Sequence, residues 1–492
     1  MENFEGQIAE KEANYNHDNR KLLVSVLQKQ YQNIKISKAT QNNILALGQS
    51  NTFTITTGHQ LNLFSGPLYF LYKIISTINL ASELKTKYPQ SNFVPIYWMA
   101  TEDHDFEEIN YFNFKGKKFH WNKDSSGPVG RLSTEGLDAV FEVFAQELGS
   151  SSNAQKIKEL FQKSYLEHSN LAEATRFLAN ELFSDYGLVI IDADPADLKR
   201  VLIPYIKDEL ENQTSYQEVT ATIEKLNEYS IQVNPREINL FYIENDLRER
   251  IILENGSYKV NHTNLSFSKV ALFRLVETNP EKFSPNVILR PLYQEVLLPN
   301  LCYIGGGGEI AYWLELQSFF NAVKVSFPML LVRNSVVLAT EKQIKKADAL
   351  HLSWADLFSK QNDLVNQKTK VLSEIGLDLS NVKEQLKKQF EALYSIAKQT
   401  DDSFIGALKA QETKQIKGIE HLEKRLLKAQ KRKLADVLNR IIQLQNELFP
   451  NQSLQERQTN FSEFYLENGE ALIPSLIAKL HPLEQRFETL IV

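Results

Sequence analysis

The stretch "TITTGHQLNLFSGPLYFLYK", residues 54–73, decides the fold. A β-branched run over residues 52–58 predicts a short strand, and the apolar spacing over 66–88 predicts a helix. The apolar run over 92–100 predicts a second strand. Two strands joined by one helix at this spacing indicate a βαβ unit with parallel strands. We therefore predict an α/β sheet with His59 at the carboxyl end of its first strand.

Several polar groups follow that first strand. Ligands of open parallel sheets bind outside the carboxyl ends of the strands, which is where His59 and Gln60 are expected. The helix that begins near Gly66-Pro67 would offer free N–H groups to a phosphate or carboxylate, and Lys73 could neutralise a phosphate. The alternative is an ordinary helix entry, with the histidine hydrogen-bonded to the backbone.

The second strand is followed by an acidic cluster in "WMATEDHDFEEIN", residues 98–110. Glu102, Asp103, His104 and Asp105 should share the sheet edge with the first strand. Such groups can position an amine, hold Mg²⁺ or act as a general base. The alternative is an acidic helix cap, although one aspartate would suffice for that. Neither HExxH nor a cysteine pair is present to support zinc, so we assign no metal ligands.

A glycine run lies in "CYIGGGGEIAYWLEL", residues 302–316. Consecutive glycines can form an anion-binding nest or let a flat base approach, and Glu309 and Tyr312 on the next helix could face the pocket. The alternative is a flexible strand-to-helix turn. Neither GxGxxG nor GxxxxGK[ST] is present, so a dinucleotide fingerprint and a P-loop are unsupported.

Four other features are weaker. Arg290 and Arg333 could bind carboxylates in a bidentate way, although surface ion pairs are the simpler interpretation. Cys302 is better explained as a small buried residue than as a nucleophile. The basic run at 424–433 is better explained as a solvated helix face than as an RNA contact.

The remaining segments suggest insertions and a helical arm. Residues 111–121 predict a hairpin, 136–186 helices, and 238–260 antiparallel strands with a tight turn at Asn255-Gly256. A late strand is expected over 327–339.

From about residue 379 to 448 the chain is rich in Lys, Glu, Gln, Leu and Ala. The triplet 400–402 should break the helical pattern and cap a second helix over 403–448. That helix would be roughly 65–70 Å long and should project as one arm of an antiparallel hairpin that pairs with a second subunit. Its seam repeats every seven residues at Leu427, Leu434, Ile441 and Leu448.

Bulk properties bound the function. The 492 residues are too many for one ordinary core, so two or three domains are expected. The net charge of −6 gives no reason to expect nucleic acid as a partner. The N-terminal stretch lacks an apolar signal sequence and no long apolar run occurs, so we expect a cytoplasmic protein without a membrane span. The single cysteine fits a reducing compartment.

Taken together, "TGHQLNLFSGPLYFLYK", "VPIYWMATEDHDFEEI", "YIGGGGEIAYW" and the late helical arm resemble the bacillithiol biosynthesis cysteine-adding enzyme family over nearly the whole chain. The resemblance implies a Rossmann-like nucleotidyltransferase core, akin to class I aminoacyl-tRNA synthetases, with inserted connective segments and a dimerising coiled coil. It implies ligation of cysteine to the amine of glucosaminyl-malate, the last step of bacillithiol synthesis. His59-Gln60 is similar to a degenerate HIGH-type motif, and no KMSKS-type loop is evident.

With that resemblance, we expect the core to span residues 1–372, with insertions at about 111–185 and 199–285. The coiled coil would span 373–449, and 450–492 would pack back on the core. The expected cofactors are ATP and, as an option, Mg²⁺. The expected partners are cysteine, glucosaminyl-malate, a nucleotide and a second copy of the chain in a homodimer.

The expected catalytic residues are His59, Asp103, His104 and Asp105. The expected nucleotide- and substrate-binding residues are Gly58, Gln60, Gly66, Lys73, Trp98, Glu102, Arg290, Gly306, Gly307, Glu309, Tyr312 and Arg333. Two alternatives stay open: another ATP-dependent ligase or nucleotidyltransferase on the same core, or a non-catalytic nucleotide-binding scaffold. Adenylate and acyl-phosphate activation are not distinguished.

Overall fold

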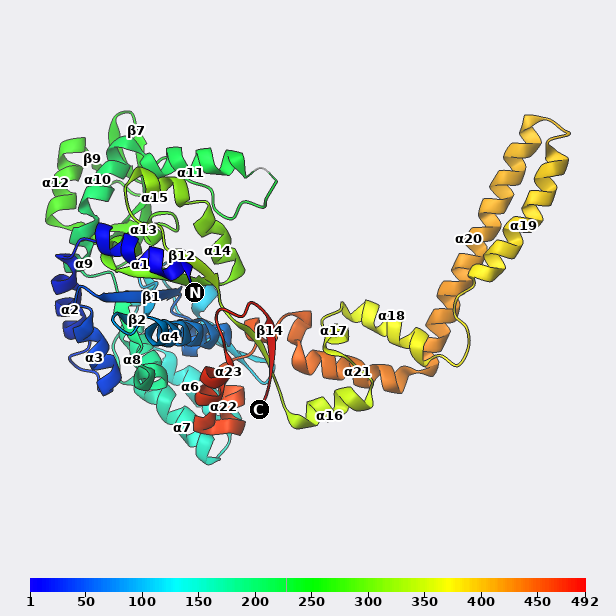
Figure 1. Cartoon of the computed structure of the whole chain (residues 1–492), viewed down its shortest axis with the longest axis horizontal. Coiled ribbons are helices and arrows are strands. Elements are labelled where there is room, and N and C mark those ends of the chain that lie inside the picture. Colours follow the sequence, from blue (N-terminus) through cyan, green and yellow to red (C-terminus); the bar gives the residue numbers. More distant parts are fainter. Residues whose placement is uncertain (227) are drawn as a thin grey trace. The chain divides into compact units, whose positions relative to one another are not determined.

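The computed structural model describes residues 1–226 and 228–492, and the chain divides into two compact units (Figure 1). The first unit contains residues 1–337, 456–490 and 492, and the second contains 338–455 and 491. The boundary therefore falls at 337/338 and not at 372/373, because the helices just after residue 340 pack with the helical arm.

A parallel sheet forms the centre of the first unit, in the order β12-β11-β1-β2-β5. The predicted first and second strands are confirmed, and they pair in register from Thr52↔Asn92 to His59↔Met99. The carboxyl ends of both strands therefore meet at one edge of the sheet. The bounds are β1 (Thr52–His59), β2 (Asn92–Met99), β5 (Val189–Asp192), β11 (Asn300–Gly305) and β12 (Met329–Val332).

The late strand expected over 327–339 is wrong as a single element. It is two strands in different sheets, because the chain leaves the central sheet after β12 and starts β13 (Ser335–Ala339). β13 pairs with β14 (Phe487–Ile491).

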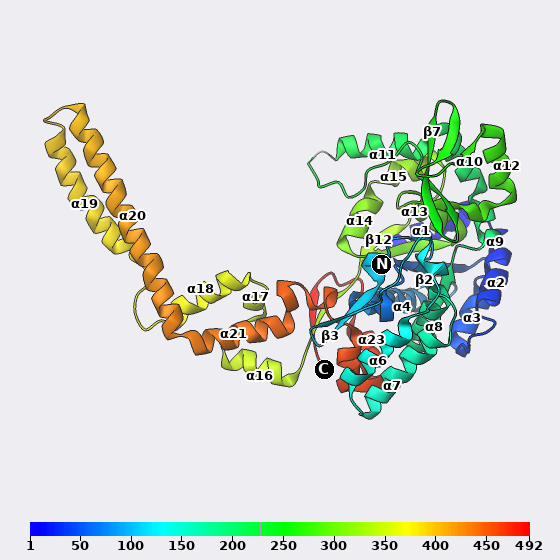
Figure 2. The ribbon, with the colours of Figure 1, turned by 180° about the vertical axis from the view of Figure 1, so that it is seen from behind.

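Helix α4 (Tyr69–Lys87) crosses from β1 to β2, as predicted, and lies beside both strands (Figures 1 and 2). Its apolar residues Leu80 and Leu84 are buried in one core cluster with Phe53 and Ile55 of β1. Burial of such side chains stabilises the βαβ unit by about 1.5–3 kcal/mol each. Other helices next to the sheet strands in sequence are α1 (Asn3–Asn14), α2 (Asn19–Gln30), α3 (Lys38–Ala46), α13 (Leu289–Leu297), α14 (Gly307–Leu314) and α15 (Gln317–Ala322).

The first insertion follows β2 and has the expected hairpin and helices. Its elements are α5 (Phe106–Ile109), β3 (Tyr111–Phe114), β4 (Lys117–His120), α6 (Leu137–Leu148), α7 (Ser152–Phe161) and α8 (Leu171–Phe183).

The second insertion is built around an antiparallel sheet in the order β10-β6-β7-β8-β9. The predicted tight turn is confirmed, because Asn255 and Gly256 have φ of 51° and 76°, as a type I′ turn requires. Its elements are α9 (Ala196–Lys199), α10 (Ile203–Asn212), α11 (Thr214–Lys225), β6 (Leu240–Glu244), β7 (Leu247–Glu254), β8 (Ser257–Val260), β9 (Ser266–Phe267), α12 (Lys269–Thr278) and β10 (Phe283–Pro285).

The C-terminal segment holds the loop between β1 and α4. Asn460 Nδ2 donates to the carbonyls of Phe64 at 2.8 Å and Gly66 at 2.6 Å. The Leu68 N–H donates to the Thr459 carbonyl at 2.9 Å. Residues 456–490 therefore cluster with the first unit. They include α22 (Phe461–Asn468) and α23 (Leu472–Lys479).

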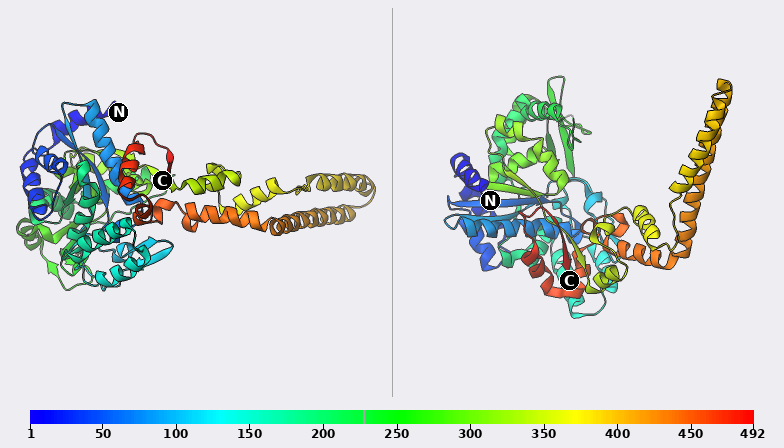
Figure 3. Two further views of the ribbon diagram at one scale, coloured as in Figure 1. Left: turned by 90° about the horizontal axis from the view of Figure 1, so that it is seen from below. Right: turned by 45° about the vertical axis from the view of Figure 1, so that its right-hand side comes forward.

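The second unit is helical, and α19 and α20 lie side by side as an antiparallel hairpin (Figure 3). Phe390, Ala397 and Leu408 are buried in its core. The predicted cap is confirmed, since the Asp401 carboxylate accepts from the backbone N–H groups of Ser403 and Phe404. The bounds are α16 (Glu341–Ala349), α17 (Trp354–Leu357), α18 (Gln361–Leu372), α19 (Ser380–Ala397), α20 (Asp402–Lys433) and α21 (Ala435–Leu448).

The single helix expected over 403–448 is wrong. It breaks at Leu434, so α20 is about 48 Å long at 1.5 Å per residue. Beyond the break, α21 buries Leu438, Ile441 and Leu444. The helices α16 and α18 contact α21, so the end of the predicted seam faces helices of its own chain.

None of the helices in residues 1–226 and 228–492 combines the length and apolar character needed to cross a bilayer.

Candidate functional site

A cavity of about 640 Å³ lies at the carboxyl edge of the sheet. Ends of the parallel strands, helices α4, α13 and α14, and the inserted antiparallel sheet all contribute to its wall. It brings together most of the predicted site residues: Gly58, His59, Gln60, Lys73, Trp98, Glu102, Asp103, His104, Asp105, Arg290, Glu309 and Tyr312. Gly66, Gly306, Gly307 and Arg333 are not among its lining residues.

An ion pair between the buried Lys73 and the partly exposed Glu309 lines the cavity. Lys73 Nζ is 2.8 Å from both carboxylate oxygens of Glu309 and also donates to the Gly58 carbonyl. Tyr303 Oη and the Gly306 N–H donate to the same carboxylate, at 2.7 and 3.2 Å. Burial opposes ionisation of Glu309, but Lys73 and these donors lower its pKa to about 2. The lysine and the carboxylate therefore form a charged pair, and each already has the other as its partner.

His59 is buried between two aromatic rings. Its imidazole lies 5.3 Å from the ring of Tyr69 and 5.1 Å from that of Phe70, centroid to centroid. Burial, followed by the neighbouring Lys73 charge, lowers the pKa of His59 to about 3. Its Nε2 has no hydrogen-bond partner among the described residues. This nitrogen is buried, so its hydrogen-bonding capacity is unused in the wall of the cavity.

The acidic loop after β2 separates two carboxylates with different properties. Asp103 accepts from the His104 N–H at 2.8 Å and from the Gln60 amide at 3.0 Å. Although burial opposes this, these hydrogen bonds hold the pKa of Asp103 below its ordinary value. Burial and the adjacent Asp103 charge raise the pKa of Asp105. Asp103 is thus a fixed anion, and Asp105 is the stronger base.

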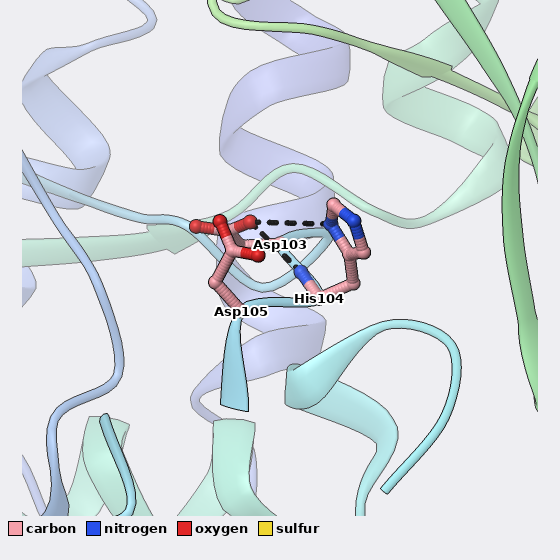
Figure 4. A group of neighbouring side chains, drawn as sticks. All are labelled: Asp103, His104 and Asp105. Carbon is pink, nitrogen blue, oxygen red and sulfur yellow. Dashed lines mark hydrogen bonds and ion pairs between the residues drawn. The ribbon is translucent and has the colours of Figure 1, made fainter. Parts of the chain in front are cut away.

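Three side chains of the same loop lie close enough together to suggest a metal site (Figure 4). Ligand atoms of Asp103, His104 and Asp105 all lie within 4.8 Å of one another. However, Arg248 Nη1 donates to His104 Nδ1 at 2.7 Å, which occupies the nitrogen lone pair and places a positive charge beside the group. These residues therefore do not fit a resident metal ion.

Glu102 belongs to a second cluster of charged side chains, together with Lys199, Asp194 and Arg131. Lys199 is fully buried and bridges Glu102 at 3.0 Å and Asp194 at 3.3 Å. Asp194 also binds Arg131 in a bidentate way, at 2.8 and 2.9 Å, and lines a neighbouring cavity of about 1310 Å³. Glu102 is therefore held in an ionic wall between two cavities.

Arg290 lines the cavity, and its guanidinium group has no ion-pair partner among the described residues. Its guanidinium donates to Tyr312 Oη at 3.0 Å and Gln294 Oε1 at 3.2 Å, and it lies 5.7 Å from the Tyr303 ring centroid. A Cβ on Gly58 would lie 3.1 Å from Tyr303 Oη and 3.4 Å from Arg290 Nη1, so a larger side chain there would crowd these two groups. Trp98 packs edge-on against Tyr293, at 5.3 Å between centroids.

The predicted glycines outside the cavity have structural explanations. Gly66 has φ of +61°, and a Cβ there would lie 2.7 Å from the Cβ of Asn62. The helix start near Gly66 is covered by Thr459 and Asn460 rather than open to an anion. Gly306 caps α14 through Glu309, and Gly307 is exposed.

Arg333 is also outside the cavity, because a buried carboxylate already binds it. Its Nη2 donates to Glu456 Oε1 at 2.6 Å, and both side chains are buried. The partner lies in the C-terminal segment, so this ion pair helps to hold that segment on the core.

Sequence reasoning missed three arginines of the second insertion that line the cavity, Arg236, Arg248 and Arg250. The signal was present in "LRERIILE", residues 247–254, where arginines two positions apart must lie on one face of a strand.

This Rossmann-like sheet with a polar cavity at its carboxyl edge, joined to a helical hairpin, defines an α/β protein with a coiled-coil domain. Two family models match: "Bacillithiol biosynthesis BshC, N-terminal Rossmann-like domain" over residues 1–334 and "Bacillithiol biosynthesis BshC, C-terminal coiled-coil domain" over 336–492. The chain belongs to the bacillithiol biosynthesis BshC family.

Curated relatives agree over full length. Proteins named "Putative cysteine ligase BshC" are 69% identical in Flavobacterium johnsoniae, covering 100% of this chain and 93% of the relative, and 64% identical in Flavobacterium psychrophilum, covering 99% and 92%. The relative from Christiangramia forsetii is 58% identical, with coverages of 100% and 92%.

Replacing Arg333 by methionine should destabilise the first unit by about 3–5 kcal/mol, because the Glu456 carboxylate is left buried and unpaired. Urea unfolding followed by tryptophan fluorescence measures this change. The double variant Arg333→Met/Glu456→Leu should recover most of the loss. Arg486→Met, at an exposed arginine paired with Glu484, is the control and should leave stability unchanged. An Arg333→Met variant as stable as its parent would contradict the assignment.

Acid should destabilise the protein partly through His59. Its folded pKa of about 3 lies below the ordinary value of 6.5, so the stability it contributes is complete above about pH 6.5 and is lost as the pH falls toward 3. His59→Gln should therefore show a shallower fall in unfolding free energy over this range. The exposed His351, replaced in the same way, should retain the parental slope. Equal slopes for parent and His59→Gln would show that this imidazole protonates freely in the folded state.

Proposed function

We propose that this chain joins the carboxyl group of cysteine to the amine of glucosaminyl-malate, with ATP activating the carboxylate and Mg²⁺ entering with the nucleotide. Membership of the bacillithiol biosynthesis family supports the pathway, and the relatives' name supports a cysteine ligase. One observation carries the substrate assignment: a single cavity holds the carboxylates of Asp103 and Asp105 together with several arginines. Such a cavity suits a substrate that carries an amine and carboxylates on one molecule.

The two aspartates divide the work on the amine. The ammonium group must lose one proton before it can attack, and the amine nitrogen loses a second proton as the new C–N bond forms and the activating group departs from the cysteine carboxyl carbon. Asp103 stays ionised and suits binding of the ammonium form. Asp105, with its raised pKa, is the better acceptor for the proton.

The nucleotide contacts fall on His59 and Arg290 in this proposal. His59 lines the cavity with an imidazole whose buried Nε2 has no partner among the described residues, and Arg290 offers positive charge with no ion-pair partner among them. Lys73 contributes less directly, because Glu309 neutralises it. Gln60 already donates to Asp103 and Glu108, both at 3.0 Å, so it holds the acidic loop.

The purified chain should convert cysteine, glucosaminyl-malate and MgATP to bacillithiol, identified by mass. AMP with pyrophosphate would indicate adenylation, and ADP would indicate an acyl phosphate. Asp105→Asn should lower kcat by about 100-fold, as expected for loss of a general base, and Asp103→Asn should mainly raise KM for the amine.

Glu107, an exposed carboxylate two residues beyond Asp105, is the matched control, and Glu107→Gln should keep parental rates. Product formation with other amines or amino acids in preference to this pair would favour a different ligase. Nucleotide binding without any product would favour the scaffold alternative.

We also propose that the helical hairpin pairs with a second copy of the chain. It exposes large apolar side chains that a solvated hairpin has no reason to carry, including Ile396 at 58%, Phe404 at 47% and Leu422 at 58% exposure.

Ile396→Glu with Phe404→Glu should convert a dimer to a monomer in size-exclusion chromatography with light scattering. Lys409→Glu, an exposed substitution on the same helix, should leave the dimer intact. A parental chain that is monomeric at micromolar concentration would contradict the pairing.

A further inference from the structure

The second insertion contributes arginines to a cavity that the parallel sheet otherwise forms. Arg248 and Arg250 lie two positions apart on β7, so their side chains lie on the same face, while Glu249 lies on the other. Arg236 reaches the cavity from the segment before β6. Three positive side chains from one insertion therefore border the site.

The three arginines differ in whether their side chains already have a partner within the protein. Arg248 donates to His104 Nδ1 at 2.7 Å and stacks over Phe241, with its Cζ 4.0 Å from the ring centroid. In the described part of the chain, neither Arg236 nor Arg250 has a side-chain hydrogen bond or ion pair. Arg236 is exposed and Arg250 is partly exposed, and both line the cavity, so their charges are available to a ligand.

The carboxylates of the cavity do not neutralise them. Glu309 is paired with Lys73 and Glu102 with Lys199. Asp103 accepts hydrogen bonds from its own loop and from Gln60. Asp103 and Asp105, which line the same cavity, form no ion pair with Arg236 or Arg250 among the described residues, so both guanidinium groups stay available to a ligand.

The position of these arginines indicates which part of a ligand they can contact. Arg248 touches His104, so its strand neighbour Arg250 lies on the side of the cavity that carries the acidic loop. In the proposed function that loop receives the amine of glucosaminyl-malate. The carboxylates of the same molecule must then lie close by, within reach of the inserted strand. The nucleotide is expected instead beside His59 and Arg290.

We propose that Arg250 and Arg236 are the specificity-determining residues that bind the dicarboxylate part of the amine substrate. The inference rests on the proposed function for the identity of that substrate. Guanidinium groups match carboxylates in a two-pronged geometry, and a dicarboxylate can engage two of them. A hexosamine without the acid would lack these contacts.

Binding of three probes to the full chain tests this directly, by calorimetry: glucosaminyl-malate, methyl glucosaminide, which has no carboxylate, and MgATP. Arg250→Gln should weaken glucosaminyl-malate about tenfold or more, the loss expected for a charge-assisted hydrogen bond. Methyl glucosaminide and MgATP should change by less than about twofold. Arg250→Lys should recover part of the affinity because it keeps the charge. Arg236→Gln should act in the same direction.

The matched control is Arg274→Gln, at an exposed arginine of α12 in the same insertion that does not line the cavity. It should bind all three probes as the parent does. A fall in MgATP affinity with unchanged glucosaminyl-malate binding would overturn the inference, because the arginines would then serve phosphates. Equal binding of glucosaminyl-malate and methyl glucosaminide by the parent would also overturn it.

Failure of the ligase proposal gives a different result. A parental chain that makes no bacillithiol, yet binds glucosaminyl-malate in an Arg250-dependent way, would refute the catalytic proposal and support the dicarboxylate site. A parental chain that makes bacillithiol with unchanged KM in Arg250→Gln and Arg236→Gln would refute the site and keep the ligase.

Discussion

The buried ammonium of Lys73 is the interaction on which the site depends. It joins helix α4 to Glu309 of α14 and to the Gly58 carbonyl at the end of β1. An ammonium in this position is costly to bury unless it is paired and hydrogen-bonded, and the carboxylate with its own two donors satisfies that need. Two crossover helices are thereby fixed at one sheet edge. Burial keeps the nearby His59 imidazole neutral by lowering its pKa, and the Lys73 charge acts in the same direction.

The cavity that this ion pair lines has an uneven distribution of charge. The loop after β2 supplies carboxylates, and the inserted sheet supplies guanidinium groups. In the proposed function, the Rossmann-like core holds the reacting groups and the insertion binds the dicarboxylate part of the substrate.

The sequence predicts the local elements better than their partners. The strands ending at His59 and Met99 were predictable, because an apolar β-branched run bounded by polar residues has few other structures. The gathering of His59 and Asp103 followed from parallel pairing. Arg333 could not be placed, since its partner Glu456 lies 123 residues away and only the folded chain shows it.

Arg250 illustrates a different limit. The alternation in its strand predicts which side chains share a face, but no local pattern predicts which part of the molecule that face lies against. The break at Leu434 was missed for a similar reason, because helical periodicity continues through it and packing of α21 on neighbouring helices decides the bend.

The hydrogen bonds from Asn460 to the loop before α4 have a consequence for biosynthesis. The carbonyls of Phe64 and Gly66 obtain these donors from a residue translated almost 400 positions later. While the nascent chain is still on the ribosome, the parallel sheet can form but this loop lacks its final partners. The loop between β1 and α4 therefore gains these hydrogen bonds only near the end of synthesis, and a chain truncated before Asn460 lacks them.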